Sequence, residues 1–193
     1  MENVTRSLQS HDFLTVGIAA NSGISKFKYY RYLKENGYEQ ISHGVYAAPD
    51  EWVDELYILY QRCPQCVFSH DEAFYYHGLT DREPLVHTLT MYSGYNAHRL
   101  TSEGHKVYNV KKELLEVGKT VVVDNCGNSI PMYDLERTVC DLIRSRNSIE
   151  AQDFNDVLKN YVKRKDKDLN KLSEYARLFR VDKILRKYLE VLL

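Results

Sequence analysis

Residues 25–34, SKFKYYRYLK, and residues 41–52, ISHGVYAAPDEW, decide the fold expected for the first part of the chain. The first stretch predicts a basic helix, because four cations fall within nine residues with no acid between them: Lys26, Lys28, Arg31 and Lys34. The second stretch alternates as a strand does and predicts a hairpin, with strands over 38–42 and 45–48. Its two-residue turn is His43-Gly44, where glycine supplies the positive φ that so tight a turn needs.

The segment before the basic helix carries further helix signals. A first helix is predicted over residues 3–10, and Thr15 caps a second over VGIAANSG, which ends at Gly23. Ser25 caps the basic helix, which ends at Asn36-Gly37. Helix, turn, basic helix and hairpin is the order of a winged helix-turn-helix, in which the second helix enters the major groove of DNA. The alternative is a small helical subdomain whose basic helix is only a solvated face.

Periodicity assigns the two faces of the basic helix. Phe27, Tyr30 and Leu33 recur every three residues and are expected on the buried face. Ser25, Lys28, Arg31 and Tyr32 then lie on the opposite side, where they suit phosphates and base edges. The residues predicted to contact DNA in this region, with His43 near the wing tip, are Ser25, Lys26, Lys28, Tyr29, Arg31, Tyr32 and His43.

Pro49-Asp50 marks the expected boundary between a DNA-binding domain, residues 1–49, and a second domain, residues 50–193. Asp50 is expected to cap a helix with an apolar stripe at Val53, Leu56, Tyr57 and Tyr60. Ser69 and Glu72 have the spacing of a capping box for a short helix, HDEAFYYH, closed by Gly78.

Strand patterns follow at 85–92, 105–110, 118–124 and 129–133, and helical periodicity continues after Pro131 to the C-terminus. With strands early and helices late, the second domain is a mixed α/β domain. The fold class expected for the whole chain is therefore α+β.

Composition excludes several classes of protein. The 193 residues, 44% of them hydrophobic, are enough for a globular core. No run approaches the roughly 18 consecutive apolar residues of a membrane span, and the N-terminus lacks the pattern of a signal peptide. A cytoplasmic location with no membrane partner is expected, and the four cysteines are expected to stay thiols.

Motifs for catalysis and metal binding are weak. Cys63-Pro-Gln-Cys66 has the spacing of a zinc or redox motif, with His70 and His77 after it, but a second cysteine pair is missing. The sequence has no nucleophile elbow, metalloprotease motif, P-loop or dinucleotide fingerprint. We therefore expect no enzyme activity, no catalytic residues, no metal and no cofactor.

Residues 151–193 contain eleven basic and seven acidic residues, a balance of +4. Amphipathic helices with this balance could form a second surface that contacts phosphates, or simply a helical layer with a charged outer face. The residues expected to contact DNA here are Lys163, Arg164, Lys165 and Arg186.

Three segments together resemble one family: FLTVGIAANSGISKFKYYRYLKENGYEQISHGVYA (13–47), VFSHDEAFYYHGLTDREP (67–84) and YDLERTVCDLIRSR (133–146). They are similar to the AbiEi antitoxins of type IV toxin-antitoxin systems, which act in abortive infection and phage resistance. The resemblance implies a winged helix-turn-helix that represses its own operon by binding promoter DNA with inverted repeats. It also implies an antitoxin domain that opposes a nucleotidyltransferase-like toxin without a stable complex.

The chain lacks the Gly-Ser and Asp-x-Asp or Asp-x-Glu pair that would hold Mg²⁺ for nucleotidyl transfer, so the toxin is expected to be another chain. The alternative function is a winged-helix repressor whose second domain binds an effector or a partner and has no antitoxin role.

Overall fold

The computed structural model describes residues 13–42, 44–49, 54–124 and 127–192. The chain forms two compact units: residues 1–64 with 123–128, and residues 65–122 with 129–193. The chain first passes from one unit to the other after Pro64, whereas the sequence predicted a boundary after residue 49.

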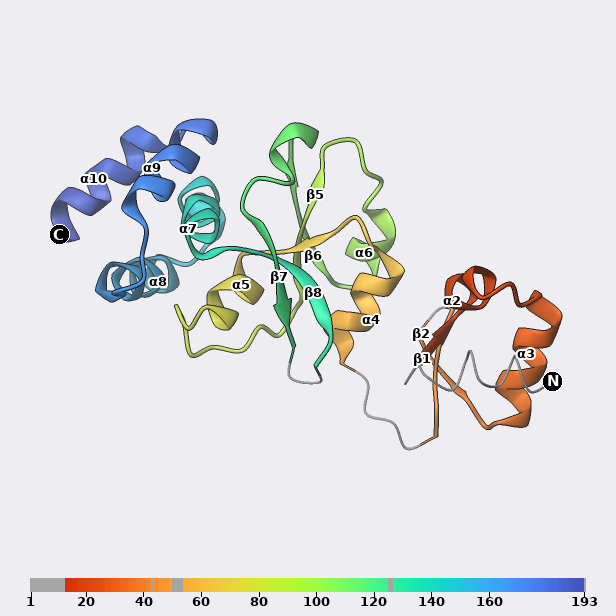
Figure 1. Cartoon of the computed structure of the whole chain (residues 1–193). Coiled ribbons are helices and arrows are strands. Elements are labelled where there is room, and N and C mark those ends of the chain that lie inside the picture. The colour runs from red at the N-terminus through yellow and green to blue at the C-terminus, as the bar shows by residue number, and fades with distance from the viewer. Residues whose placement is uncertain (1–12, 43, 50–53, 125–126, 193) are drawn as a thin grey trace. The chain divides into compact units, whose positions relative to one another are not determined.

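The first unit combines short helices with a small sheet. Strand β1 (Phe13–Thr15) leads directly into α2 (Val16–Asn21), which is followed by α3 (Lys26–Glu35), β2 (Glu39–Ser42), β3 (Val45–Ala47) and α4 (Glu55–Arg62) (Figure 1). The sheet has the order β1-β3-β2, and both pairs are antiparallel. The predicted β2–β3 hairpin is therefore confirmed. Strand β1 was not predicted, and the helix predicted over 3–10 lies outside the described residues.

Both predicted caps around the helix pair are present. The Thr15 hydroxyl accepts a hydrogen bond from the Ile18 N–H at 3.1 Å, and the Ser25 hydroxyl accepts one from the Lys28 N–H at 3.5 Å. Gly23 follows the end of α2 with φ +70°, a conformation that glycine adopts at little cost. Capping and a glycine stop are local effects, and for that reason the sequence predicted them correctly.

The predicted faces of α3 were right for Leu33 and the basic residues and wrong for the aromatic ones. Phe27 is 76% exposed and Tyr30 48% exposed, whereas Tyr29, Tyr32 and Leu33 are buried. The buried side packs with other core residues of the first unit: Leu14, Ala19 and Ile24. Tyrosines lie on both the buried and the exposed side of this helix. Because a tyrosine ring can pack in a core or lie on a hydrated surface, hydropathy alone could not choose between the two faces.

The start of α4 also differs from the prediction. Asp54, and not Asp50, caps the helix, and its Oδ1 accepts hydrogen bonds from the Leu56 and Tyr57 N–H groups at 2.8 and 3.1 Å. Asp50 and Val53 lie outside the described residues. Of the helix residues, Leu59 is the buried one.

The second unit is built on a five-stranded mixed sheet of order β6-β5-β4-β8-β7. Strand β4 is antiparallel to β5 and parallel to β8, and β5 is parallel to β6. The strands are β4 (Val67–Phe68), β5 (Thr88–Tyr92), β6 (Lys106–Val110), β7 (Lys119–Val123) and β8 (Ser129–Tyr133). Four of the five were predicted; β4 is too short for its periodicity to stand out. All of Thr88–Met91 is buried, so both faces of β5 are covered.

Helices follow the sheet, as the sequence predicted. Figure 1 shows α7 (Leu135–Arg144), α8 (Ala151–Lys163), α9 (Leu169–Leu178) and α10 (Asp182–Leu192) gathered at one side of the sheet. The short helices α5 (Asp71–Tyr76) and α6 (His98–Ser102) and the 3-10 turns Lys112–Leu114 and Arg146–Ser148 connect the strands and helices. Helix α7 lies at the centre of the largest core, where Val139 and Leu142 pack with Leu158, Tyr161 and Leu172. The α+β class is thereby confirmed.

Candidate nucleic-acid interface and buried polar network

The exposed side of α3 is basic and aromatic. Ser25, Lys26, Lys28 and Arg31 are all exposed, as the sequence predicted, and so is Lys34. Phe27 and Tyr30 share this exposure, and an exposed aromatic ring beside cations is typical of a surface that binds a polyanion. The Arg31 Nε lies 3.7 Å from the Glu35 carboxylate, but both side chains are about half exposed, so this pair is weak.

Two residues predicted to contact DNA are instead core residues. Tyr29 is fully buried and Tyr32 is 7% exposed. The Tyr32 ring packs 5.8 Å from that of Tyr38. Burial also raises the pKa of Tyr29, so its hydroxyl stays neutral. These two residues hold α3 in place and do not offer a surface to DNA.

The hairpin packs against α3 through the Tyr46 side chain, among others. The Tyr46 ring of β3 makes edge-on contacts with Tyr29 and Tyr30, with centroids 6.2 and 6.3 Å apart. Gly44 has φ +76°, as the tight turn requires, while His43 lies outside the described residues. The position of the hairpin beside the helix is therefore fixed by aromatic packing.

The predicted basic residues of the C-terminal helices fall into two groups. Lys163, Lys165 and Arg186 are exposed. Arg164 is engaged: Nη1 donates to the His77 carbonyl at 2.6 Å, while Nε and Nη2 donate to the Asp166 carboxylate. This forked hydrogen bond raises the pKa of Arg164 and lowers that of Asp166. Arg164 therefore joins α8 to the segment after α5.

Ser69 and Glu72 do not form the predicted capping box. The Ser69 hydroxyl is hydrogen bonded to Thr90 Oγ1 at 2.8 Å and to His70 Nδ1 at 2.9 Å. The Glu72 carboxylate is 2.6 Å from His87 Nδ1. Helix α5 begins after His70, whose φ is +50° and whose side chain makes no cap. Both motif residues lie in the buried interior, where the sheet offers them partners that no local pattern reveals.

His70 links two distant segments of the second unit. Its Nε2 is hydrogen bonded to Ser145 Oγ at 2.9 Å, and its ring stacks on Tyr108 with centroids 3.4 Å apart. Burial lowers the pKa of His70 to about 3, so the imidazole is neutral at neutral pH. It therefore acts as a neutral bridge between the start of α5 and the end of α7.

His77 and Leu79, from the segment HGL, anchor other elements. The His77 Nε2–H donates to the Tyr133 carbonyl at 2.8 Å, and burial lowers the pKa of its ring. The Leu79 carbonyl accepts from the Asn160 side chain of α8 at 3.1 Å. The structure thus gives this motif a physical role: it joins β8 and α8.

Arg137 is the centre of the second buried network. Its side chain is fully buried, with Nε 3.0 Å from Asp141 Oδ2 and Nη1 donating to the Leu114 and Val117 carbonyls. The guanidinium lies between the rings of Tyr133 and Phe179, 3.8 and 4.1 Å from their centroids. This residue was missed by sequence reasoning; the signal was an Arg and an Asp four residues apart inside an apolar helix.

Within the described residues, no group of three or more His, Cys, Asp and Glu side chains could hold a metal ion. Cys63 and Cys66 are both buried. No helix in the described ranges is long and apolar enough to span a membrane.

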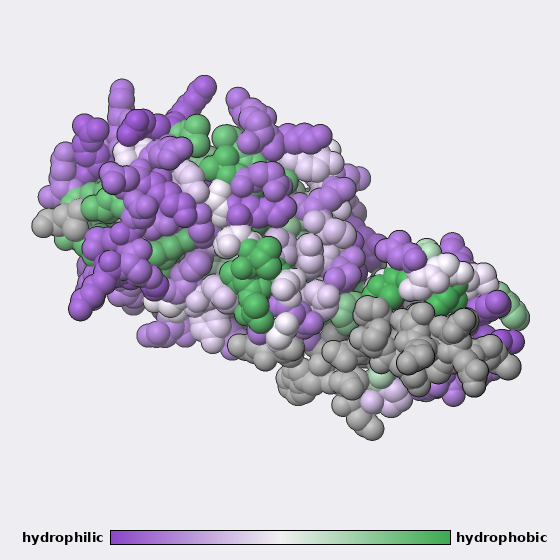
Figure 2. Space-filling model, in the orientation of Figure 1, coloured by the Kyte–Doolittle hydropathy of each residue, from purple (hydrophilic) through white to green (hydrophobic). Residues whose placement is uncertain are grey.

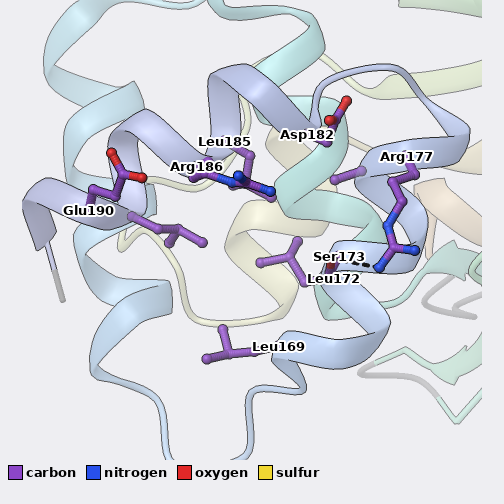
Figure 3. A pocket seen from close by; sticks show the side chains of 10 residues that line it. Leu169, Leu172, Ser173, Arg177, Asp182, Leu185, Arg186 and Glu190 are labelled. Carbon is purple, nitrogen blue, oxygen red and sulfur yellow. Dashed lines mark hydrogen bonds between the residues drawn. The ribbon is translucent and has the colours of Figure 1, made fainter.

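A groove of about 500 Å³ lies between α9 and α10 (Figure 3). Its apolar wall consists of Leu169, Leu172, Ala176, Leu185 and Leu189. Arg177, Asp182, Arg186 and Glu190 add charges of both signs, and Arg177 is tied to Ser173 at 3.2 Å. Around it, the C-terminal helices present mainly hydrophilic side chains with hydrophobic ones between them (Figure 2).

Neither a protein-family model nor a curated protein matches the sequence. Among solved structures, the chain is similar to the crystal structure of the RV2827C protein from Mycobacterium tuberculosis, with a TM-score of 0.60 and 12% sequence identity. The match covers 91% of this chain and 70% of that protein. At this identity, the likeness shows that the two chains share a fold.

Proposed function

We propose that the chain is a DNA-binding autorepressor whose second unit is an antitoxin. The observation that carries the DNA-binding part is the exposed side of α3, where Lys26, Lys28, Arg31 and Lys34 lie together. Cations on one side of a helix that is held by its opposite face are the usual means of contacting phosphates and base edges.

The arrangement around α3 supports a winged helix-turn-helix. Helices α2 and α3 are joined by residues 22–25, and the Ile24 N–H donates to the Ala19 carbonyl at 2.8 Å within this connection. Ile24 itself is buried. The β2–β3 hairpin follows α3, which is the place of the wing, and in such proteins the wing touches the neighbouring backbone.

Binding to the DNA upstream of the gene tests this proposal. Lys28→Ala combined with Arg31→Ala should weaken binding at least tenfold and reduce the salt dependence by about two phosphate contacts. Arg82→Ala combined with Arg99→Ala is the matched control, because it removes two exposed arginine charges from the second unit. Equal affinity for the double variant of α3 and the wild type would overturn the proposal.

The antitoxin role rests on the resemblance to the AbiEi family, carried by residues 67–84 and 133–146. The test is growth of cells that co-express the full chain with the product of the adjacent gene. The Lys28→Ala, Arg31→Ala variant should still restore growth, because the change leaves the second unit intact. Failure of the soluble wild-type protein to restore growth would remove the antitoxin role.

A second candidate is a repressor whose second unit binds an effector or a partner. The groove between α9 and α10 favours it, since apolar walls with a few charged groups are typical of ligand sites. Intact promoter binding without growth rescue would support this candidate over the antitoxin.

A further inference from the structure

A second groove, of about 400 Å³, lies in the second unit between the end of β6, the turn after it and the ends of α7 and α9. Three cations line it, Lys111, Arg144 and Arg180, against one carboxylate, Glu113. We call it the basic groove. Its volume falls within the range of about 300–1,000 Å³ that small-molecule sites occupy.

The groups behind the basic groove do not cancel its positive charge. Arg144 Nη1 lies 2.7 Å from Asp141 Oδ1, but the other oxygen of Asp141 already pairs with the buried Arg137. Two arginines thus share one carboxylate. Arg137 also has a buried Nη2 with no hydrogen-bond partner in the structure. A positive excess that is partly screened from water attracts an anion more strongly than solvated lysines do.

Arg144 is held in position before any ligand arrives. Besides its bond to Asp141, its guanidinium lies 5.2 Å from the centroid of the Phe179 ring, and 28% of its side chain remains exposed. A fixed guanidinium with free N–H groups suits the oxygens of a phosphate, because less side-chain entropy is lost on binding.

Arg180 occupies a position where a glycine is usual. It follows α9 with φ +58°, and the Val181 N–H donates to the Ala176 carbonyl in the manner of a helix-ending turn. Stability alone favours glycine here, so an exposed arginine in a left-handed conformation indicates a role for its charge. Within the described part of the chain, its side chain has no ion pair.

The rest of the lining is suited to an organic group. Leu178, 47% exposed, and Phe179 form an apolar wall, and Ser93 and Asn109 offer hydrogen-bonding groups. We propose that the basic groove binds a nucleoside monophosphate group, with Lys111, Arg144 and Arg180 on the phosphate and the apolar wall beside the nucleoside. The proposal concerns the second unit and is independent of DNA binding by α3.

Calorimetry on the full chain at low salt tests the proposal, with the four ribonucleoside monophosphates, the unphosphorylated nucleosides and inorganic phosphate as probes. At least one monophosphate should bind ten times more tightly than its nucleoside and than phosphate. A 5′-phosphorylated trinucleotide that binds more tightly still would identify an RNA end as the source. Absence of binding, or equal binding of inorganic phosphate, would overturn the proposal.

Arg180→Gly separates binding from folding. The glycine should raise the melting temperature, because it relieves the left-handed arginine, and yet weaken monophosphate binding at least fivefold. Lys183→Gln, which removes an exposed cation from α10, is the control and should leave binding unchanged. Unchanged binding in Arg180→Gly would contradict the assignment of this residue. Promoter binding should be equal in both variants, so failure here is distinguishable from failure of the DNA-binding proposal.

Discussion

Helices α3 and α7 each contain ten residues, and each begins after a side chain that accepts a backbone hydrogen bond, Ser25 and Asp134. In α3 the cations face solvent. In α7 Arg137, Glu136 and Asp141 are all buried. The two helices use similar polar residues for opposite purposes, one as a surface and one as an internal support.

The contrast shows that the hydrogen-bond acceptors around a cation decide whether its side chain can be buried in the core. Arg137 is buried because Asp141 and two carbonyls receive its N–H groups, and the Glu136 carboxylate similarly accepts the Asp168 N–H at 3.0 Å. Among the described residues, no comparable set of acceptors surrounds Lys28, whose side chain is exposed. A buried charge without partners would cost several kcal/mol, so Arg137 is buried only because these acceptors come with it.

The largest effect is expected for Arg137→Met. The change leaves Asp141 buried with part of its partners lost, so we expect the free energy of unfolding to fall by about 3–5 kcal/mol. Urea denaturation followed by circular dichroism measures it. Arg99→Met, which removes an exposed arginine, should cost less than about 0.5 kcal/mol. If both variants were equally stable, Arg137 would not be the support proposed for it.

Gly118→Ala should have the next largest effect. A Cβ at Gly118 would lie 2.5 Å from the Arg137 Cβ, and the residue has φ +73°. Overpacking of about 1–3 kcal/mol adds to a backbone cost of about 1 kcal/mol. Gly78→Ala is matched in backbone conformation, with φ +63°, but has open space around it. Equal losses in the two alanine variants would show that α7 tolerates a closer neighbour.

Acidification should weaken the second unit through His70. The pKa of His70 falls from 6.5 to about 3 on burial, so between these values the unfolded chain binds a proton that the folded chain does not. The contribution of neutral His70 to the free energy of unfolding is fully present above pH 6.5. The free energy of unfolding should therefore fall by about 2 kcal/mol by pH 5. The test is to measure the free energies of unfolding of the wild type and of His70→Gln at about pH 7 and at pH 5. A wild-type profile as flat as that of the glutamine variant would contradict it.

The smallest effect on stability is expected for α3. Lys28→Ala combined with Arg31→Ala should change the free energy of unfolding by less than about 0.5 kcal/mol, because both side chains are exposed and the Arg31–Glu35 pair is weak. A thermal melt measures it. A loss of 2 kcal/mol or more would mean that the exposed side of α3 supports the fold, and the contrast with α7 would disappear.

Local features of this fold could be predicted from the sequence. Thr15, Ser25, Gly23 and Gly44 act on hydrogen bonds and backbone angles within four residues of themselves, and the structure places each as expected. The strands after residue 85 and the helices after Pro131 were equally predictable, because the spacing of hydrophobic residues that predicts each one lies within a single segment of the sequence. The exposed part of the candidate DNA-binding surface, Lys26, Lys28 and Arg31, belongs with these features.

The remaining features depend on contacts between distant segments. Ser69 and Glu72 matched a capping box, but Thr90 of β5 and His87, just before that strand, became their partners. Tyr29 was buried in place of Phe27 because strand β3 supplied a ring for it to pack against. His70 is hydrogen bonded to Ser145, which lies 75 residues further along the chain, and no local sequence pattern predicts that pairing. By itself the sequence determined the ends of α2 and α3 and the turn of the β2–β3 hairpin, since those depend on neighbours along the chain. The tertiary structure decided which polar groups are buried, since burial requires partners that only folding brings together.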